Sequence, residues 1–166
     1  DESDEQALGD ESTYSRLQRV FPLARRYDVV HRNLYKVHQR VAATFRMGRV
    51  FLAGDSAHVN NSVGGLGLNG GIHDAMELID TLHQVITKQA GEALFDRYTR
   101  RRRTLNIEFV QEQTINNKKR LEERDAKARQ ARFDELRATA EDPAKHKEFL
   151  LRTSLIASVR KAQSME

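Results

Sequence analysis

The residues most able to do chemistry lie close together in the middle of the 166-residue chain. Asp55 belongs to a Gly-Asp-Ser-Ala turn, where its carboxylate can accept hydrogen bonds from the hydroxyls of a ligand. Glycines follow it; they let the backbone approach a ligand without a Cβ, and a helix that opens there points free N–H groups outward. The candidate binding residues are Gly54, Asp55, Gly64, Gly65, Gly67, Leu68 and Asn69. The pattern predicts a site for an anionic ligand.

Three consecutive elements are predicted to position this site. Residues 49–53 form a short apolar run with β-branched and aromatic residues, which predicts a buried strand. Residues 54–69 are polar and glycine-rich, so a loop is expected. From Gly70 onward the apolar residues recur at helical spacing. They are Ile72, Ala75, Met76, Ile79, Leu82 and Ile86. We expect this helix to continue to about Lys88 and to be closed at Gly91.

The hexapeptide from Gly65 to Gly70 matches the GxGxxG pattern of dinucleotide-binding turns, but two features argue against that interpretation. In a dinucleotide-binding fold the glycines follow their strand directly, whereas here a long loop separates them from Ala53. The acidic residue at the expected distance, Glu92, has no predicted strand near it. We therefore predict that this match is not a dinucleotide fingerprint.

The histidines of the same region raise the question of a metal site. His58 and His73 lie near Asp55 and Asp74 in the sequence, but their spacing matches no established ligand motif and the chain has no cysteine. We predict no metal site. Instead we expect His58 to order the loop and Asp74 to lie in the first turn of the helix, where its charge favours the helix dipole. The catalytic residues stay unknown at this level.

Two blocks separated by a short linker, Gly54 to His58 and Gly64 to Ala75, resemble the second flavin-binding segment of the FAD-dependent aromatic hydroxylases. These enzymes are the single-component flavoprotein monooxygenases related to p-hydroxybenzoate hydroxylase. The resemblance extends upstream through residues 35–42 and downstream through residues 94–98. It thins out beyond about Asn117.

The resemblance implies an α/β fold, or an α+β part of one, in which short strands of the substrate and FAD-binding sheets precede long C-terminal helices. It implies FAD as cofactor, with Asp55 holding the ribitol chain and the helix opening at Leu68 and Asn69 facing the flavin ring. NADH or NADPH would be the co-substrate, and a small aromatic or polycyclic substrate would be hydroxylated with O2. Many relatives have prolines near Asn61 and Ser62, so we expect a looser turn here.

Four parts are expected along the chain. They are an acidic disordered tail (1–12), the end of a substrate-domain sheet (13–47), the second FAD-binding segment of strand, glycine loop and helix (48–91) and a C-terminal helical region (92–166). Strands are expected between Tyr27 and Val41, and Asp142 with Pro143 is predicted to begin the last helix. Compared with the family, the chain starts past the midpoint. We therefore expect a C-terminal portion that meets a missing N-terminal half or forms homo-oligomers.

The composition excludes several classes of protein. A hydrophobic content of 39%, a charged content of 31% and the lack of cysteine fit a soluble, cytoplasmic protein without disulfides. No apolar run approaches the roughly 18 residues of a membrane span. The net charge is +4 and the segment from Arg97 to Arg132 is the most basic, but its interspersed acids favour a solvated helix face over a nucleic-acid site. Two alternatives stay open: a non-catalytic helical interaction module with this basic face, and an inactive enzyme-derived fragment.

Overall fold

The computed structural model describes residues 2–165, and the chain divides after Val37 into two compact units. The first unit contains two short helices, α1 (Asp4–Leu8) and α2 (Asp10–Val20). Ser3 begins α1 with a capping box, in which the Gln6 N–H donates to Ser3 Oγ at 3.2 Å and the Ser3 N–H donates to Gln6 Oε1 at 2.9 Å. The disordered tail predicted for residues 1–12 is therefore not what the structure has from Ser3 on, and residue 1 lies outside the described part.

The stretch of residues 27–41, at the end of the first unit and the start of the second, is less regular than the sequence predicts. Of the strands expected between Tyr27 and Val41, the structure has only β1 (Arg40–Val41). A strand needs a hydrogen-bonded neighbour, and within residues 2–165 nothing pairs with residues 27–39. Val30 is 95% exposed and Tyr35 is 82% exposed, so the β-branched and aromatic composition here does not reflect burial.

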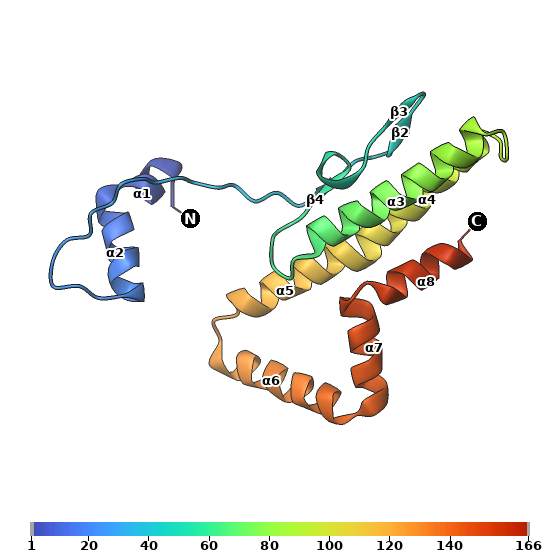
Figure 1. Ribbon diagram of the computed structural model, residues 1–166. Helices are drawn as coiled ribbons and strands as arrows, with labels where there is room; N and C mark the ends of the chain where they lie inside the picture. The colour runs from blue at the N-terminus through green and yellow to red at the C-terminus, as the bar shows by residue number, and fades with distance from the viewer. Residues whose placement is uncertain (1, 166) are drawn as a thin grey trace. The chain divides into compact units, whose positions relative to one another are not determined.

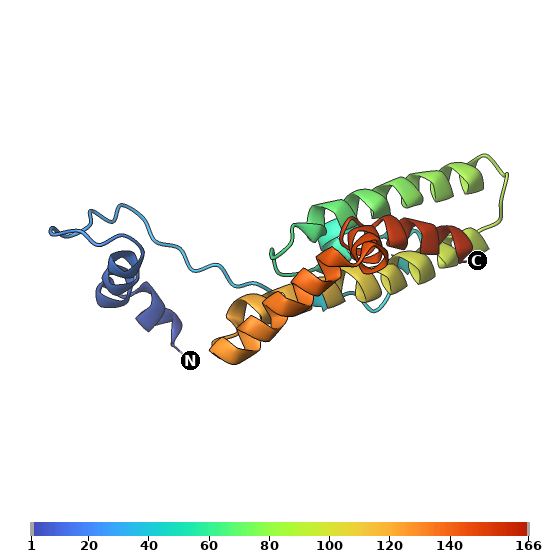
Figure 2. The same cartoon turned by 90° about the horizontal axis from the view of Figure 1, so that it is seen from below.

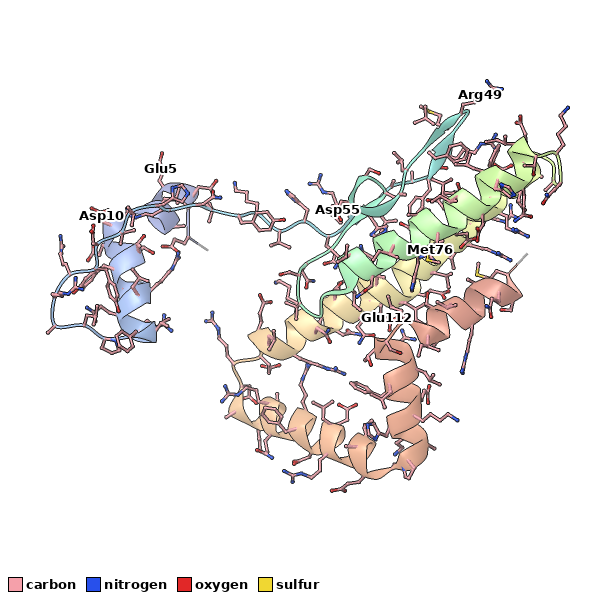
Figure 3. All side chains as sticks on the ribbon, viewed as in Figure 1. Glu5, Asp10, Arg49, Asp55, Met76 and Glu112 are labelled. Atoms are coloured by element: carbon pink, nitrogen blue, oxygen red, sulfur yellow. The ribbon has the colours of Figure 1, made fainter. Side chains whose placement is uncertain are left out.

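The second unit starts with two small antiparallel pairs. β1 pairs with β4 (His58–Val59), and β2 (Arg46–Met47) pairs with β3 (Val50–Phe51) as a hairpin. Arg49 lies at the tip of that hairpin (Figure 3). The strand predicted for residues 49–53 is thus present but short, and it is only partly buried, since Val50 is 62% exposed.

Two long helical segments lie side by side and form the frame of the second unit (Figures 1 and 2). The first is α3 (Leu66–Ile86), and the second runs through α4 (Ala93–Leu105), the π-helical segment η2 (Asn106–Gln111) and α5 (Glu112–Glu122) without leaving helical backbone angles. α3 ends one turn before the glycine expected to close it. Lys88, with φ +60°, takes the left-handed conformation there.

Three further helices complete the chain: α6 (Ala126–Glu141), α7 (Pro143–Thr153) and α8 (Ile156–Ser164). Asp142 caps α7 as predicted, accepting a hydrogen bond from the Ala144 N–H at 2.9 Å, with Pro143 as the first helical residue. The single final helix expected from the apolar pattern is divided in two. Leu155, with φ +61°, turns the chain so that α8 packs on α4.

The apolar core of the second unit forms two clusters around the long helices. One contains Leu66, Leu105, Phe109, Val110 and Leu155. The other contains Phe45, Ala57 and Tyr98, and it joins the strands to α4. The architecture is a small α/β arrangement dominated by helices toward the C-terminus, as predicted. No helix in the part of the chain that the structure describes is long and apolar enough to cross a membrane.

Candidate functional site

The turn that carries Asp55 is a single 3₁₀ turn, η1 (Gly54–Ser56), directly after β3. Ser56 holds it: its hydroxyl donates to the Ala53 carbonyl at 2.8 Å and accepts from the Ala53 N–H at 3.2 Å. The Asp55 side chain is exposed and has no hydrogen-bond partner among residues 2–165. Figure 3 shows Asp55 on this turn beside α3. Its carboxylate is free to accept hydrogen bonds from a ligand.

Two glycines let η1 lie directly on the second turn of α3. Gly54 has φ +59°, which a residue with a side chain rarely adopts. A Cβ built on Gly71 would lie 3.1 Å from the Gly54 Cα, closer than ordinary carbon contacts. The pair therefore fixes the distance between the Asp55 turn and the start of the helix.

The glycine loop before α3 also depends on its glycines. Gly64 has φ +106° and Gly65 has φ +65°, and a Cβ on Gly64 would lie 2.7 Å from Asn117 Nδ2. Gly65 is the N-cap of α3 and offers no side chain to the N–H groups of the first turn. The helix begins at Leu66, four residues before the predicted start, so Leu68 and Asn69 lie in its first turn and are exposed.

The buried carboxylate of Asp74 holds these pieces together. Its Oδ2 accepts hydrogen bonds from the Gly54 N–H at 3.0 Å and from His58 Nε2 at 2.8 Å, and its Oδ1 accepts from Arg102 Nε at 2.7 Å. The Asp74 side chain is fully buried and the Arg102 side chain is 4% exposed. One carboxylate thus joins η1, β4 and α4 to α3.

The protonation of this centre follows from its surroundings. Burial acts to raise the pKa of Asp74, but the hydrogen bond from His58, the positive charge and hydrogen bond of Arg102 and the Gly54 N–H outweigh it, and the pKa is lowered. Asp74 is therefore ionised, and His58 Nε2 carries the hydrogen that it donates. Burial and the charge of Arg102 lower the pKa of His73, one residue away.

The role of Asp74 differs from the one that its position in the sequence predicts. Asp74 lies in the third turn of α3, where it cannot interact with the helix N-terminus as expected, and it pairs with side chains from other elements instead. Arg102 was missed because it stands within four consecutive arginines. The available signal was its spacing, since Tyr98, Arg102 and Leu105 occupy one buried face of α4.

A second polar cluster orders the linker before the glycines. Asn61 Nδ2 donates to Gln39 Oε1 at 2.8 Å and to the Thr114 carbonyl at 3.0 Å, while Asn61 Oδ1 accepts from the Val63 N–H at 3.1 Å. Gln39 Nε2 in turn donates to Gln111 Oε1 at 2.7 Å. The looser turn expected where relatives have prolines is therefore not observed, because side-chain hydrogen bonds from Asn61 fix the same stretch.

The residues present fit a flavin cofactor. Asp55 offers an unpaired carboxylate to ligand hydroxyls, and the first turn of α3 offers N–H groups without a side-chain cap. A Cβ on Gly64 would clash with the Asn117 side chain, so this glycine lets the loop pack closely on α5, whereas a Cβ on Gly65 would meet nothing within 4 Å. Within residues 2–165 no group of three or more His, Cys, Asp or Glu residues could hold a metal ion.

Several known proteins are similar to this chain. Residues 5–113 match a family described as an FAD binding domain. A para-nitrophenol 4-monooxygenase from Pseudomonas sp. (strain WBC-3) is 41% identical over 139 residues, which are 83% of this chain and 34% of that protein. A 3-(3-hydroxy-phenyl)propionate/3-hydroxycinnamic acid hydroxylase from Mycolicibacterium smegmatis is 45% identical over 103 residues, 62% of this chain and 18% of that protein.

A solved structure extends the similarity to the fold. The crystal structure of p-nitrophenol 4-monooxygenase PnpA from Pseudomonas putida DLL-E4 superposes with a TM-score of 0.73 at 36% identity, covering 91% of this chain and 38% of that one. The chain thus spans about a third or less of the length of the curated relatives named above. Since the family match covers residues 5–113 of the 166, this chain belongs to the FAD-binding domain family of the flavoprotein aromatic hydroxylases.

Proposed function

We propose that this chain supplies FAD contacts to a monooxygenase that hydroxylates an aromatic substrate with NADH or NADPH and O2. The observation that carries the proposal is the packing of η1 against α3. This packing places the unpaired Asp55 carboxylate near the start of a 21-residue helix that has no side-chain cap. FAD, when bound, supplies the redox chemistry: it accepts a hydride from the nicotinamide and activates O2.

Each element has its own task in this proposal. Asp55 accepts hydrogen bonds from the ribityl hydroxyls, and Gly64, Gly65 and Gly67 keep the approach free of side chains. The N–H groups near Leu68 and Asn69 stabilise negative charge on the edge of the ring that faces them, an effect that the helix dipole reinforces. Asp74 acts behind these residues by fixing the distance from Gly54 to α3.

The substrate is proposed from the relatives. The names of two of these enzymes specify a nitrophenol and a hydroxyphenyl acid, both aromatic rings that carry a hydroxyl. For hydroxylation at an unsubstituted ring carbon the balanced reaction consumes the ring C–H, O2, one NAD(P)H and one proton, and it yields the phenol, NAD(P)+ and water. Residues 48–91 are the proposed flavin-contacting segment; cytoplasmic location and self-association stay predictions.

The alternative of an interaction module with a basic face has less support. Three of the four consecutive arginines that begin the basic segment are used inside the second unit: Arg102 pairs with Asp74, Arg103 Nε donates to the Ala42 carbonyl at 3.0 Å, and Arg101 lies 3.6 Å from Glu77. Such residues are not available to a polyanion. The proposal of an enzyme part is therefore preferred.

Flavin titration of the chain tests the cofactor contact. FAD fluorescence polarisation is measured for the wild type, Asp55→Ala and the control Asp80→Ala; Asp80 is an exposed carboxylate of α3 without a partner in the described part of the chain. We expect saturable binding that weakens by about tenfold or more in Asp55→Ala and is unchanged in Asp80→Ala. No saturable binding, or equal binding by both variants, contradicts the flavin contact.

The reaction is tested separately on the FAD-loaded protein with isotopically labelled O2 and a set of substituted phenols. We expect NADH or NADPH to be oxidised only in the presence of a phenol and one labelled oxygen atom to appear in the product. Oxidation of the nicotinamide without label in any product would mean an oxidase or reductase, and the hydroxylase proposal would be wrong.

A further inference from the structure

A concave pocket lies outside the candidate flavin site, between α5, α6 and the linker before α3. It has a volume of about 420 Å³, within the size range of small-molecule pockets. α5 and α6 meet at the short connection of residues 123–125 (Figure 1), and residues of both helices line the pocket. Its lining residues are Val63, Gly64, Asn117, Arg120, Leu121, Arg129, Arg132, Phe133 and Leu136.

The floor of this pocket is apolar and open to solvent. Leu121 is 73% exposed, Phe133 is 61% exposed and Leu136 is 38% exposed. α6 buries none of its residues, so these side chains do not serve a core there. A cluster of large, exposed apolar side chains in a concave surface is typical of a ligand-binding site.

Three arginines surround this floor, and two of them have no acidic partner in the described part of the chain. Within residues 2–165 no carboxylate lies within ion-pair distance of Arg120 or Arg129, and Arg132 reaches only Glu123, at 4.0 Å. Other arginines of the second unit are paired closely, for example Arg102 with Asp74 at 2.7 Å. A guanidinium pairs with a carboxylate through two parallel hydrogen bonds, so this pair of free arginines suits an acidic group.

We propose that this pocket binds a hydrophobic carboxylate, with its apolar body on Leu121 and Phe133 and its acid group on Arg120 and Arg129. The shared chemistry is an apolar body of one or two rings, or a medium acyl chain, joined to one acid group. The pocket is distinct from the proposed flavin site: it shares Gly64 with the glycine loop, but neither Asp55 nor Asn69 lines it. The proposal therefore stands independently of flavin binding.

The first experiment uses anilinonaphthalene sulfonate, a fluorescent hydrophobic anion, on the full chain. The double variant Arg120→Gln/Arg129→Gln is compared with the control Arg137→Gln, an exposed arginine of α6 that does not line the pocket. We expect the dissociation constant of the dye to rise by about tenfold in the double variant and to stay unchanged in the control. Equal affinities in all three proteins overturn the proposal.

The apolar contact has a matched pair of variants. Leu121 and Ile86 are both 73% exposed, but only Leu121 lines the pocket. Leu121→Ala should weaken binding of the dye, and Ile86→Ala should leave it unchanged. Because both side chains are exposed, neither substitution should lower the melting temperature appreciably. Equal loss of dye binding in both variants would place the dye on general apolar surface and overturn the proposal.

Competition identifies the ligand class. Biphenyl carboxylate represents the aromatic source and decanoate the acyl source, and each is compared with its neutral alcohol. We expect each carboxylate to displace the dye at a concentration about tenfold lower than its alcohol does, because only the acid pairs with the arginines. The acid that displaces the dye at the lower concentration shows whether the ligand is an aromatic acid or a fatty acid. Alcohols as effective as acids, or displacement of the dye by FAD, would overturn a separate carboxylate site.

Discussion

Asp74 Oδ1 accepts a hydrogen bond from Arg102 Nε at 2.7 Å, and this buried pair joins α3 to α4. The other oxygen of the same carboxylate accepts from the Gly54 N–H and from His58. The turn that presents Asp55 is therefore held in place by the Asp74 carboxylate, which is buried and not accessible to a ligand. Loss of that charge should affect the fold first and the flavin site as a consequence.

Replacement of Asp74 by asparagine should destabilise the chain strongly. Asp74→Asn leaves the buried Arg102 guanidinium with only Glu77, at 4.0 Å, as a counter-charge, and breaking such a buried pair costs about 3–5 kcal/mol of the free energy of unfolding. Urea unfolding followed by circular dichroism measures the change. The control is Asp80→Asn at an exposed position of α3, where less than about 0.5 kcal/mol is expected. Similar losses in both variants would show that the buried pair adds no stability.

The same pair predicts a dependence of stability on pH. The pKa of Asp74 is lower in the folded chain than its ordinary value of 3.8, so the unfolded state binds this proton more readily. The stabilisation by Asp74 is thus fully present above the ordinary pKa and is lost as pH falls through the lowered one. The difference in free energy of unfolding between wild type and Asp74→Asn should be constant near neutral pH and shrink in acid. A difference that grows in acid contradicts this sign.

The local parts of the site could be predicted from the sequence, and the long-range parts could not. The order of strand, glycine loop and helix, and the cap at Asp142, follow from neighbouring residues. The partner of Asp74 could not be predicted, because Arg102 lies 28 positions away on another helix and only the packing of α3 on α4 brings the two together. The helix start at Leu66 was missed for a related reason: glycine-rich sequence favours a loop, but tertiary contacts support the helix there.

The strand and tail predictions failed for a different reason. A run of β-branched residues forms a strand only when another segment pairs with it, and residues 27–39 have no such neighbour in the described part of the chain. The acidic composition of the first residues outweighed the capping signal of Ser3 and Gln6, which starts α1. In both cases the composition gave a weaker indication than a specific hydrogen-bonding partner.

Replacement by alanine should affect stability differently at two glycines of α3, Gly67 and Gly71. Both substitutions gain helix propensity, but the new Cβ would meet the Gly54 Cα at 3.1 Å in Gly71→Ala and the Asn60 side chain at 3.1 Å in Gly67→Ala. A side chain can move aside and the backbone of η1 cannot without loss of the Asp74 contact. We expect Gly71→Ala to be less stable than Gly67→Ala by about 1–3 kcal/mol in urea unfolding. Equal stabilities would mean that η1 shifts freely.

The hydrogen bonds of Asn61 should contribute to stability. Asn61→Ala leaves the buried Thr114 carbonyl and the Gln39 amide with fewer partners, so a loss of about 1–3 kcal/mol is expected. Ser62→Ala is the control, since the exposed Ser62 side chain makes no hydrogen bond in the described structure. Thermal unfolding of the two variants measures the difference. An unchanged melting temperature in Asn61→Ala would mean that water replaces its contacts without cost.

The end of α3 offers a substitution that should stabilise the chain. Lys88 is exposed and has φ +60°, a conformation that costs a residue with a side chain roughly 1–2 kcal/mol and costs glycine almost nothing. Lys88→Gly removes this strain but also gives the unfolded chain more freedom, so we expect a net gain of about 0.5–1 kcal/mol in urea unfolding. The matched control is Lys119→Gly, an exposed lysine within α5, where glycine should cost about 0.5–1 kcal/mol. The same substitution should therefore have opposite signs at the two positions, and a loss at both would mean that Lys88 does not hold the left-handed conformation in solution.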